Sequence, residues 1–95
     1  MRWKEYLNET EHPEGDTFDR AIFGIAMVSL ELVGQLNEFT CAGKSWDPMT
    51  ARSLTGKLMR NVAMLCRAHD WRLEDILVED VKVHQADVKQ LTDHE

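Results

Sequence analysis

The sequence has few of the residues that build metal centres and disulfide frameworks. Its 95 residues include two cysteines, Cys41 and Cys66, and contain neither a Cys-x-x-Cys nor a His-x-x-x-His pair. We therefore expect neither a structural zinc site nor a disulfide scaffold. Both cysteines fall in predicted helices among small or apolar neighbours, which favours buried free thiols in a reducing compartment.

Other absences exclude whole classes of function. There is no glycine-rich phosphate loop, and no serine has the surroundings of a nucleophile. The formal net charge is −6, so bulk electrostatics disfavours nucleic acid as a partner. The apolar run that starts at Ala21 is broken by Glu31, which makes it too short to span a bilayer. We therefore expect no membrane partner and a soluble, cytoplasmic protein.

The patterns that are present predict an all-α protein of about four helices in a single domain, residues 1–95. Residues 1–17 are read as a short helix and an acidic loop, and residues 18–91 as the helical core. Asp16 or Thr17 is expected to cap a long helix that ends at Ala42, before Gly43. Further helices are expected from Asp47-Pro48 to about 69–70 and from Leu73 onward.

The last helix carries a heptad-like seam. Its apolar positions repeat at intervals of four and three residues, a spacing that suits packing along another helix. The long helix before it is also more apolar than one thin layer could cover, and short chains often gain stability by oligomerising. We therefore expect a homo-oligomer, a dimer or a tetramer. The seam consists of Leu77, Val81, His84, Val88 and Leu91.

Glu31 stands alone in an otherwise apolar stretch of the long helix. A charge in a helix that looks buried on all sides needs a partner, a metal or water. The partner of Glu31 is therefore the most informative clue to function.

Three segments together carry a family resemblance. They are Gly24-x₅-Leu30-Glu31-x-x-Gly34-x-Leu36, then Leu54-x-Gly56-x-Leu58, and then residues 62–77. The last segment resembles the family pattern L-x-x-L-G-I-D-L-E-E-V-L. This arrangement resembles the MazG-like all-α nucleoside triphosphate pyrophosphohydrolases over roughly residues 18–90. The resemblance implies a MazG-like helical core, a dimeric or tetrameric assembly and a nucleoside triphosphate ligand.

The family signature, E-E-x-x-E on one helix and E-x-x-D on the next, binds Mg²⁺ that polarises the triphosphate and activates water. On this sequence the first acid is Glu31, and the others fall on Leu32, Gln35, Leu54 and Lys57. Because the site lacks most of its carboxylates, we expect no cofactor. The remnant site is then Glu31, Gln35 and Lys57, with the Lys57 ammonium in the place of the metal and paired with Glu31. Alternatively, Lys57 extends to solvent and Glu31 meets water or a backbone donor.

The same helix has a basic side. Lys57 and Arg60, with Asn61, are candidates for binding nucleotide phosphates without a metal, because arginine matches phosphate geometry well. The other interpretation is a solvated face paired with acids of the last helix. The basic residues on this side are Arg52, Lys57, Arg60 and Arg67.

A relocated cation site is a further alternative, in which Glu31, Glu38 and Asp80 bind Mg²⁺. Three classes of function therefore stay open. The first is a non-catalytic MazG-like protein that binds nucleotide, phosphate or another protein. The second is an active Mg²⁺-dependent pyrophosphohydrolase with rearranged carboxylates. The third is a regulatory or inhibitory interaction protein that uses the fold as a scaffold.

Overall fold

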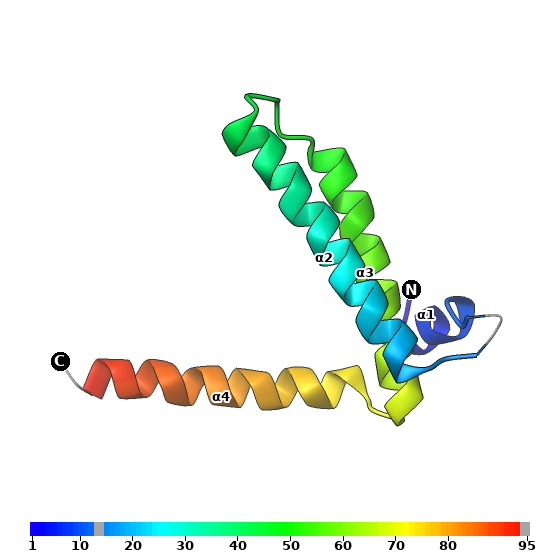
Figure 1. Cartoon of the computed structure of the whole chain (residues 1–95). Coiled ribbons are helices and arrows are strands. Elements are labelled where there is room, and N and C mark those ends of the chain that lie inside the picture. Colours follow the sequence, from blue (N-terminus) through cyan, green and yellow to red (C-terminus); the bar gives the residue numbers. More distant parts are fainter. Residues whose placement is uncertain (13–14, 94–95) are drawn as a thin grey trace.

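The chain is all-helical in a computed structural model that describes residues 1–12 and 15–93 (Figure 1). Four helices follow one another along this part of the chain: α1 (Trp3–Glu9), α2 (Phe18–Cys41), α3 (Pro48–His69) and α4 (Leu73–Asp93). No strand occurs among the described residues. The predicted fold class and the order of the helices are confirmed, and Pro13 and Glu14 of the predicted loop lie outside the described residues.

The helix ends follow the local signals. Asp47 caps α3, because its Oδ1 accepts hydrogen bonds from the backbone N–H groups of Met49 (3.1 Å) and Thr50 (3.2 Å), and Pro48 begins the helix. Thr17 precedes α2, but its side chain makes no capping bond. At the other end of α3, Asp70 adopts a left-handed conformation with φ 55°, in a role that glycine more often fills.

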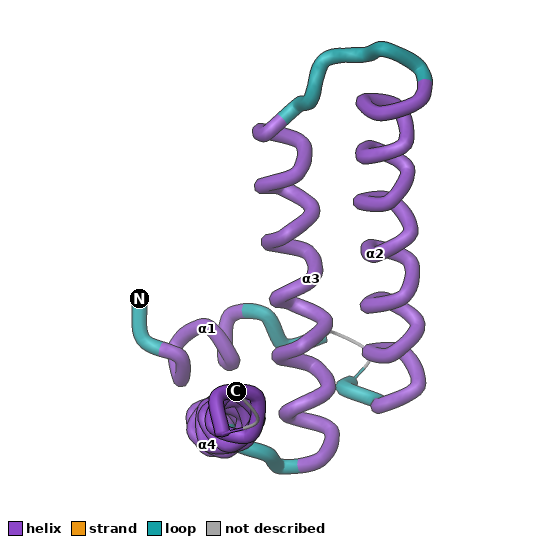
Figure 2. The backbone as a smooth tube through the Cα atoms, turned by 90° about the vertical axis from the view of Figure 1, so that its left-hand side faces the viewer, coloured by secondary structure: helices purple, strands orange, loops and turns teal. Residues whose placement is uncertain are grey.

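The core is the contact between α2 and α3, which run antiparallel as a helical hairpin (Figure 2). The connection between them contains Gly43, whose φ of 70° turns the chain after α2. The buried apolar residues come from the facing sides of these two helices: Ala21, Val28, Leu54, Ala63, Met64 and Cys66.

α1 packs against the lower part of α3, whereas α4 extends away from the hairpin and makes no extensive contact with the other described helices (Figure 1). The apolar surfaces that we expected to be covered are consequently open within one chain. On α2, Leu30, Val33 and Leu36 are exposed, and so is Glu31. The expectation that α2 is buried on all sides is therefore wrong for a single chain, because only one side of α2 faces another helix.

Two further expectations are corrected. Cys66 is buried, as expected, and burial raises the pKa of its thiol, but Cys41 is exposed at the end of α2. The expectation of no membrane span considers only the apolar run before Glu31. α2 continues to Cys41, and its 24 residues are long and apolar enough to cross a membrane by length and composition alone.

Candidate functional site

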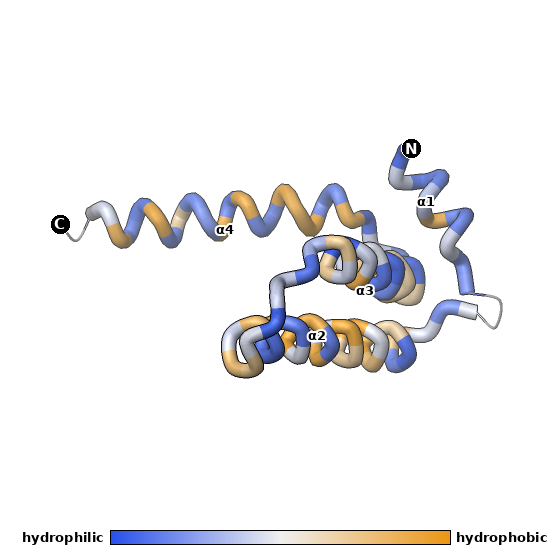
Figure 3. Tube along the Cα trace, turned by 90° about the horizontal axis from the view of Figure 1, so that it is seen from above, coloured by the Kyte–Doolittle hydropathy of each residue, from blue (hydrophilic) through white to orange (hydrophobic). Residues whose placement is uncertain are grey.

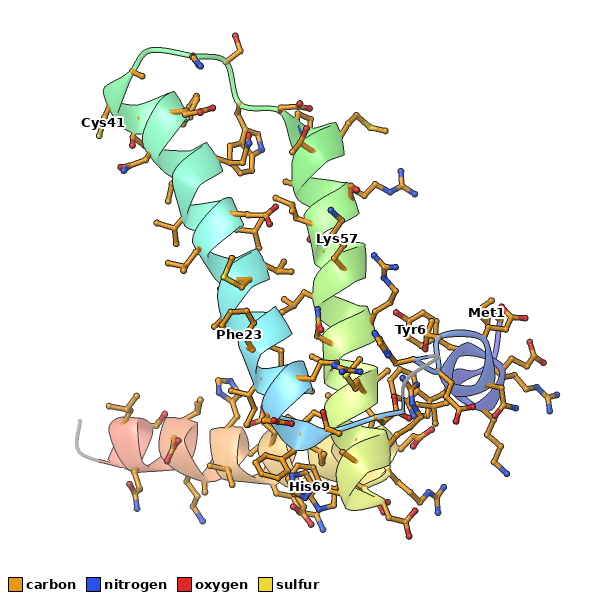
Figure 4. The ribbon with its side chains drawn as sticks, turned by 45° about the vertical axis from the view of Figure 1, so that its right-hand side comes forward. Met1, Tyr6, Phe23, Cys41, Lys57 and His69 are labelled. Atoms are coloured by element: carbon orange, nitrogen blue, oxygen red, sulfur yellow. The ribbon has the colours of Figure 1, made fainter. Side chains whose placement is uncertain are left out.

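A cavity of about 480 Å³ lies where α1, the segment after it, α2 and α3 meet. It brings together all three residues predicted to bind phosphate. Lys57 and Arg60 are exposed and Asn61 is half-buried, and Figure 4 shows Lys57 on α3 beside α2. The wall also includes both acidic and apolar side chains. The residues around the cavity are Glu9, Thr10, Glu11, His12, Gly24, Met27, Val28, Lys57, Arg60, Asn61 and Met64.

The spacing on α3 explains why this trio shares one wall. Residues three or four positions apart lie on the same face of a helix, which places Asn61 one turn after Lys57. The Asn61 side-chain amide donates a hydrogen bond to the Lys57 backbone carbonyl at 2.9 Å. This bond uses one amide hydrogen and leaves the carboxamide oxygen and a second N–H as polar groups of the wall.

Gly24 allows the close approach of α2 to this part of α3. A Cβ atom at position 24 would collide with the side-chain amide of Asn61. The absence of a side chain at Gly24 therefore leaves room for the Asn61 side chain at the cavity.

Arg67 positions the wall that α1 and its following segment provide. Its guanidinium donates to both carboxylate oxygens of Asp16, from Nε at 2.8 Å and from Nη2 at 3.1 Å. It also donates to the carbonyls of Leu7 at 2.9 Å and Thr10 at 3.0 Å, and to the Thr10 hydroxyl at 3.2 Å. The Arg67 and Asp16 side chains are only 14% and 12% exposed. A bidentate pair with so little solvent holds the N-terminal segment firmly against α3.

This network corrects two interpretations of the sequence. Arg67 was grouped with the basic side of α3, but its donors are used inside the fold and not on the acids of α4. Asp16 belongs to the segment predicted to be an acidic loop and was a candidate cap of the long helix, but its carboxylate is partly buried and accepts hydrogen bonds from Arg67. The hydrogen bond from Arg67 lowers the pKa of Asp16 below its usual value of 3.8, against a smaller opposing effect of burial.

His12, in the acidic loop after α1, is also a cavity residue. Its Nδ1 lies 2.9 Å from Nη1 of Arg20, and the same Arg20 nitrogen donates to the Gly15 carbonyl at 3.3 Å. These contacts attach the segment after α1 to the start of α2. A polar segment interrupted by glycine gives no periodic signal, so nothing in the pattern indicated that His12 faces the cavity.

The residues of the predicted remnant site, Glu31, Gln35 and Lys57, do not all lie at the cavity. Lys57 lines the cavity, whereas Glu31 and Gln35 are not among its lining residues. Glu31 lies one turn beyond Met27 along α2, on the same side of the helix. In residues 1–12 and 15–93, no hydrogen bond or ion pair joins Glu31 to Lys57. The physical reason is that Glu31 is exposed, so water solvates its charge and no buried cation is required.

The candidate metal ligands lie apart within one chain. Glu31 and Glu38 are both on α2, and Glu38 approaches Lys44 at 3.9 Å on the surface. Asp80 is on α4, which extends away from the hairpin (Figure 1). No group of three acidic, histidine or cysteine side chains suited to a metal occurs in the part of the chain that the structure describes. A Mg²⁺ site built from these carboxylates stays a prediction.

Comparison with known protein families, with characterised proteins and with solved structures finds no match to this chain.

Proposed function

We propose that this chain is a MazG-like helical protein that binds a phosphate-bearing small molecule, of the nucleotide class, without a metal. The observation that carries the proposal is the single cavity shared by Lys57, Arg60 and Asn61. Ammonium and guanidinium groups form strong charge-assisted hydrogen bonds to phosphate. The segments that resemble MazG-like proteins lie on α2, on α3 and at the start of α4, and α2 and α3 form this cavity together with α1.

The acids of the same wall favour a nucleotide over inorganic phosphate. Glu9 and Glu11 repel a bare anion, but carboxylates accept hydrogen bonds from hydroxyl and amino groups. Met27, Val28 and Met64 add apolar surface. Cations, acceptors and apolar groups together suit a ligand that has a phosphate, a sugar and a base.

Isothermal titration calorimetry with ATP in the presence of EDTA tests the proposal. The wild-type chain should bind, and Lys57→Ala or Arg60→Ala should each weaken affinity at least about tenfold. Charge-assisted hydrogen bonds contribute roughly 1.5–3 kcal/mol, and about 1.4 kcal/mol corresponds to a tenfold change.

Arg52→Ala is the matched control, because Arg52 is exposed on α3 and does not line the cavity. It should leave affinity within about twofold, since distant exposed charges are screened by salt. Wild-type protein that binds no nucleotide would overturn the proposal, and so would an equal loss in all three variants.

The same titration with Mg²⁺ in place of EDTA tests the alternative, an active pyrophosphohydrolase. Release of pyrophosphate that is abolished by Glu31→Gln would assign the chain to that class, because a carboxylate metal ligand cannot be replaced by an amide without weakening the site.

A further inference from the structure

α4 is the helix that receives the least support from the rest of the chain. Every residue from Glu74 to Thr92 is exposed, and α4 makes no extensive contact with the other described helices. Most of the stability of a helix in a protein comes from packing its apolar face rather than from its own hydrogen bonds. The open apolar side of α4 therefore indicates a surface that another molecule covers.

The seam predicted from the sequence lies along one side of α4. Its large apolar residues, Leu77, Val81, Val88 and Leu91, are 55%, 53%, 46% and 72% exposed. Figure 3 shows hydrophobic residues repeated along the length of this helix. Intervals of four and three residues are those of a coiled-coil contact, in which the matching surface is a second amphipathic helix. The occupant that fits this spacing is therefore a helix.

The charges that border the seam are negative. Asp80 and Asp87 are seven residues apart and lie along the same edge of the seam, and Glu74 lies beside its first turn. Lys82 and Lys89 are directed away from the seam. No ion pair neutralises the three acids in the part of the chain that the structure describes. Flanking charges select the partner of a coiled-coil helix, so the complementary helix has lysine or arginine at this edge.

The hairpin does not provide a helix of this kind. α3 has the basic residues, but its apolar side is already packed against α2. α2 has exposed apolar residues, but its charges do not complement those of α4, because three of the four are acidic. The charged residues of α2 are Asp19, Arg20, Glu31 and Glu38.

A second α4 does not complement the seam either. In an antiparallel pair, the edge with Asp80 and Asp87 would face the same edge of the other copy and bring aspartates together. In a parallel pair, it would face the opposite edge, which is uncharged and consists of Val78, Gln85 and Thr92. An anionic bilayer is also disfavoured, because such a surface attracts basic and not acidic segments. Charge complementarity therefore favours a helix of another protein.

We propose that α4 is a docking helix for a partner protein, and that the partner supplies an amphipathic helix whose apolar seam is flanked by lysine or arginine. The two helices pack along the seam as a two-stranded coiled coil, with basic side chains of the partner opposite Asp80 and Asp87. No residue that lines the phosphate cavity lies on α4, so docking holds or fails independently of the proposed function.

Isothermal titration calorimetry of the full chain with two synthetic peptides tests the proposal. Each peptide matches the 21 residues of α4 in length and has leucine at its seam positions. The peptides differ only at the flanking positions, which are lysine in the basic peptide and glutamate in the acidic one. The chain should bind the basic peptide at least about tenfold more tightly than the acidic peptide. Equal affinity for both peptides, or binding of neither, would overturn the proposal.

Charge reversal locates the contact on α4. The double variant Asp80→Lys with Asp87→Lys should reverse the preference and bind the acidic peptide at least about fivefold more tightly than the basic one. Asp75→Lys with Glu79→Lys is the matched control, because it changes the net charge equally on the side of α4 opposite the seam. The control should keep the wild-type preference. The same response from both double variants would contradict a contact at the seam.

Val81→Glu tests for other occupants of the seam. It should abolish binding of the basic peptide, because it puts a charge into the apolar contact, and it should leave the mass of the chain alone unchanged in sedimentation equilibrium. A wild-type oligomer that Val81→Glu dissociates would assign the seam to a second copy. Flotation with phosphatidylcholine–phosphatidylglycerol vesicles that is lost in Val81→Glu would assign it to a bilayer. Either result would overturn the proposal.

Discussion

At the scale of single residues, Arg67 is the side chain on which the N-terminal part of the fold most depends. It reaches Asp16, Leu7 and Thr10, which are more than 50 positions away in the sequence. The partly buried contact between His12 and Arg20 also joins the segment before α2 to the hairpin, but it reaches only the start of α2. The Arg67–Asp16 pair therefore determines whether α1 and the segment after it can form one wall of the cavity.

Replacing Arg67 with alanine should lower the free energy of unfolding by about 3–5 kcal/mol, because it leaves the nearly buried Asp16 carboxylate without its partner. Arg67→Lys should recover little of this loss, since an ammonium cannot make the bidentate contact. Urea denaturation followed by circular dichroism measures both. Arg52→Ala should change stability by less than about 0.5 kcal/mol, and a similar result for Arg67→Ala would contradict the role assigned to it.

The same pair predicts a dependence on pH. The pKa of Asp16 is lowered in the folded state, mainly by its hydrogen bond from Arg67. Its contribution to stability is therefore present above the unfolded value of 3.8 and is lost as the pH falls through the lower folded value. Between pH 7 and pH 3, the wild type should lose more stability than Asp16→Asn, as measured by urea denaturation at both pH values. An equal loss in both would contradict this assignment.

At the scale of elements, Gly24 of α2 and Gly56 of α3 differ in how closely other residues approach them. Gly24 faces Asn61, whereas a Cβ atom at Gly56 would meet nothing within 4 Å. Gly56→Ala should stabilise the protein by about 0.5–1 kcal/mol, which is the helix-propensity gain of alanine over glycine. Gly24→Ala should lack this gain and should displace Asn61. Thermal unfolding compares the two variants, and an equal gain in both would contradict the close packing.

The sequence predicted the helices well because their signals are local. Asp47-Pro48 and Gly43 define helix ends through capping and backbone conformation, and these need no knowledge of the partner helix. The shared position of Lys57, Arg60 and Asn61 was also predictable, since residues 57, 60 and 61 must lie on one side of a helix.

The remainder depended on contacts between distant segments. The partner of Arg67, the position of His12 and the exposure of Glu31 each follow from how helices pack, which hydrophobic periodicity does not specify. An apolar face indicates that a helix is covered by something, but not whether the cover belongs to the same chain. For this reason Glu31 was expected to be buried, and it is exposed in the single chain.

At the scale of the whole molecule, an extended chain with two open apolar surfaces should depend on association for its stability. A dimer that unfolds to separate chains becomes less stable on dilution. Differential scanning calorimetry should show Tm falling by about 3–5 °C for each tenfold dilution. This shift is the free energy that a tenfold dilution costs the dimer, divided by the entropy of unfolding. A Tm that stays constant over a hundredfold range would show that one chain is stable alone.

The most direct measurement of the proposed activity is a nuclear magnetic resonance titration of the ¹⁵N-labelled chain with ATP in EDTA. Binding at the cavity should produce saturable shifts of the Asn61 side-chain amide and of the backbone amides of Gly24, Lys57 and Arg60, which border the cavity. Resonances of the far half of α4 should stay in place. Two results would contradict metal-free phosphate binding at this cavity. One is a set of shifts confined to α4, and the other is the absence of any shift during the titration.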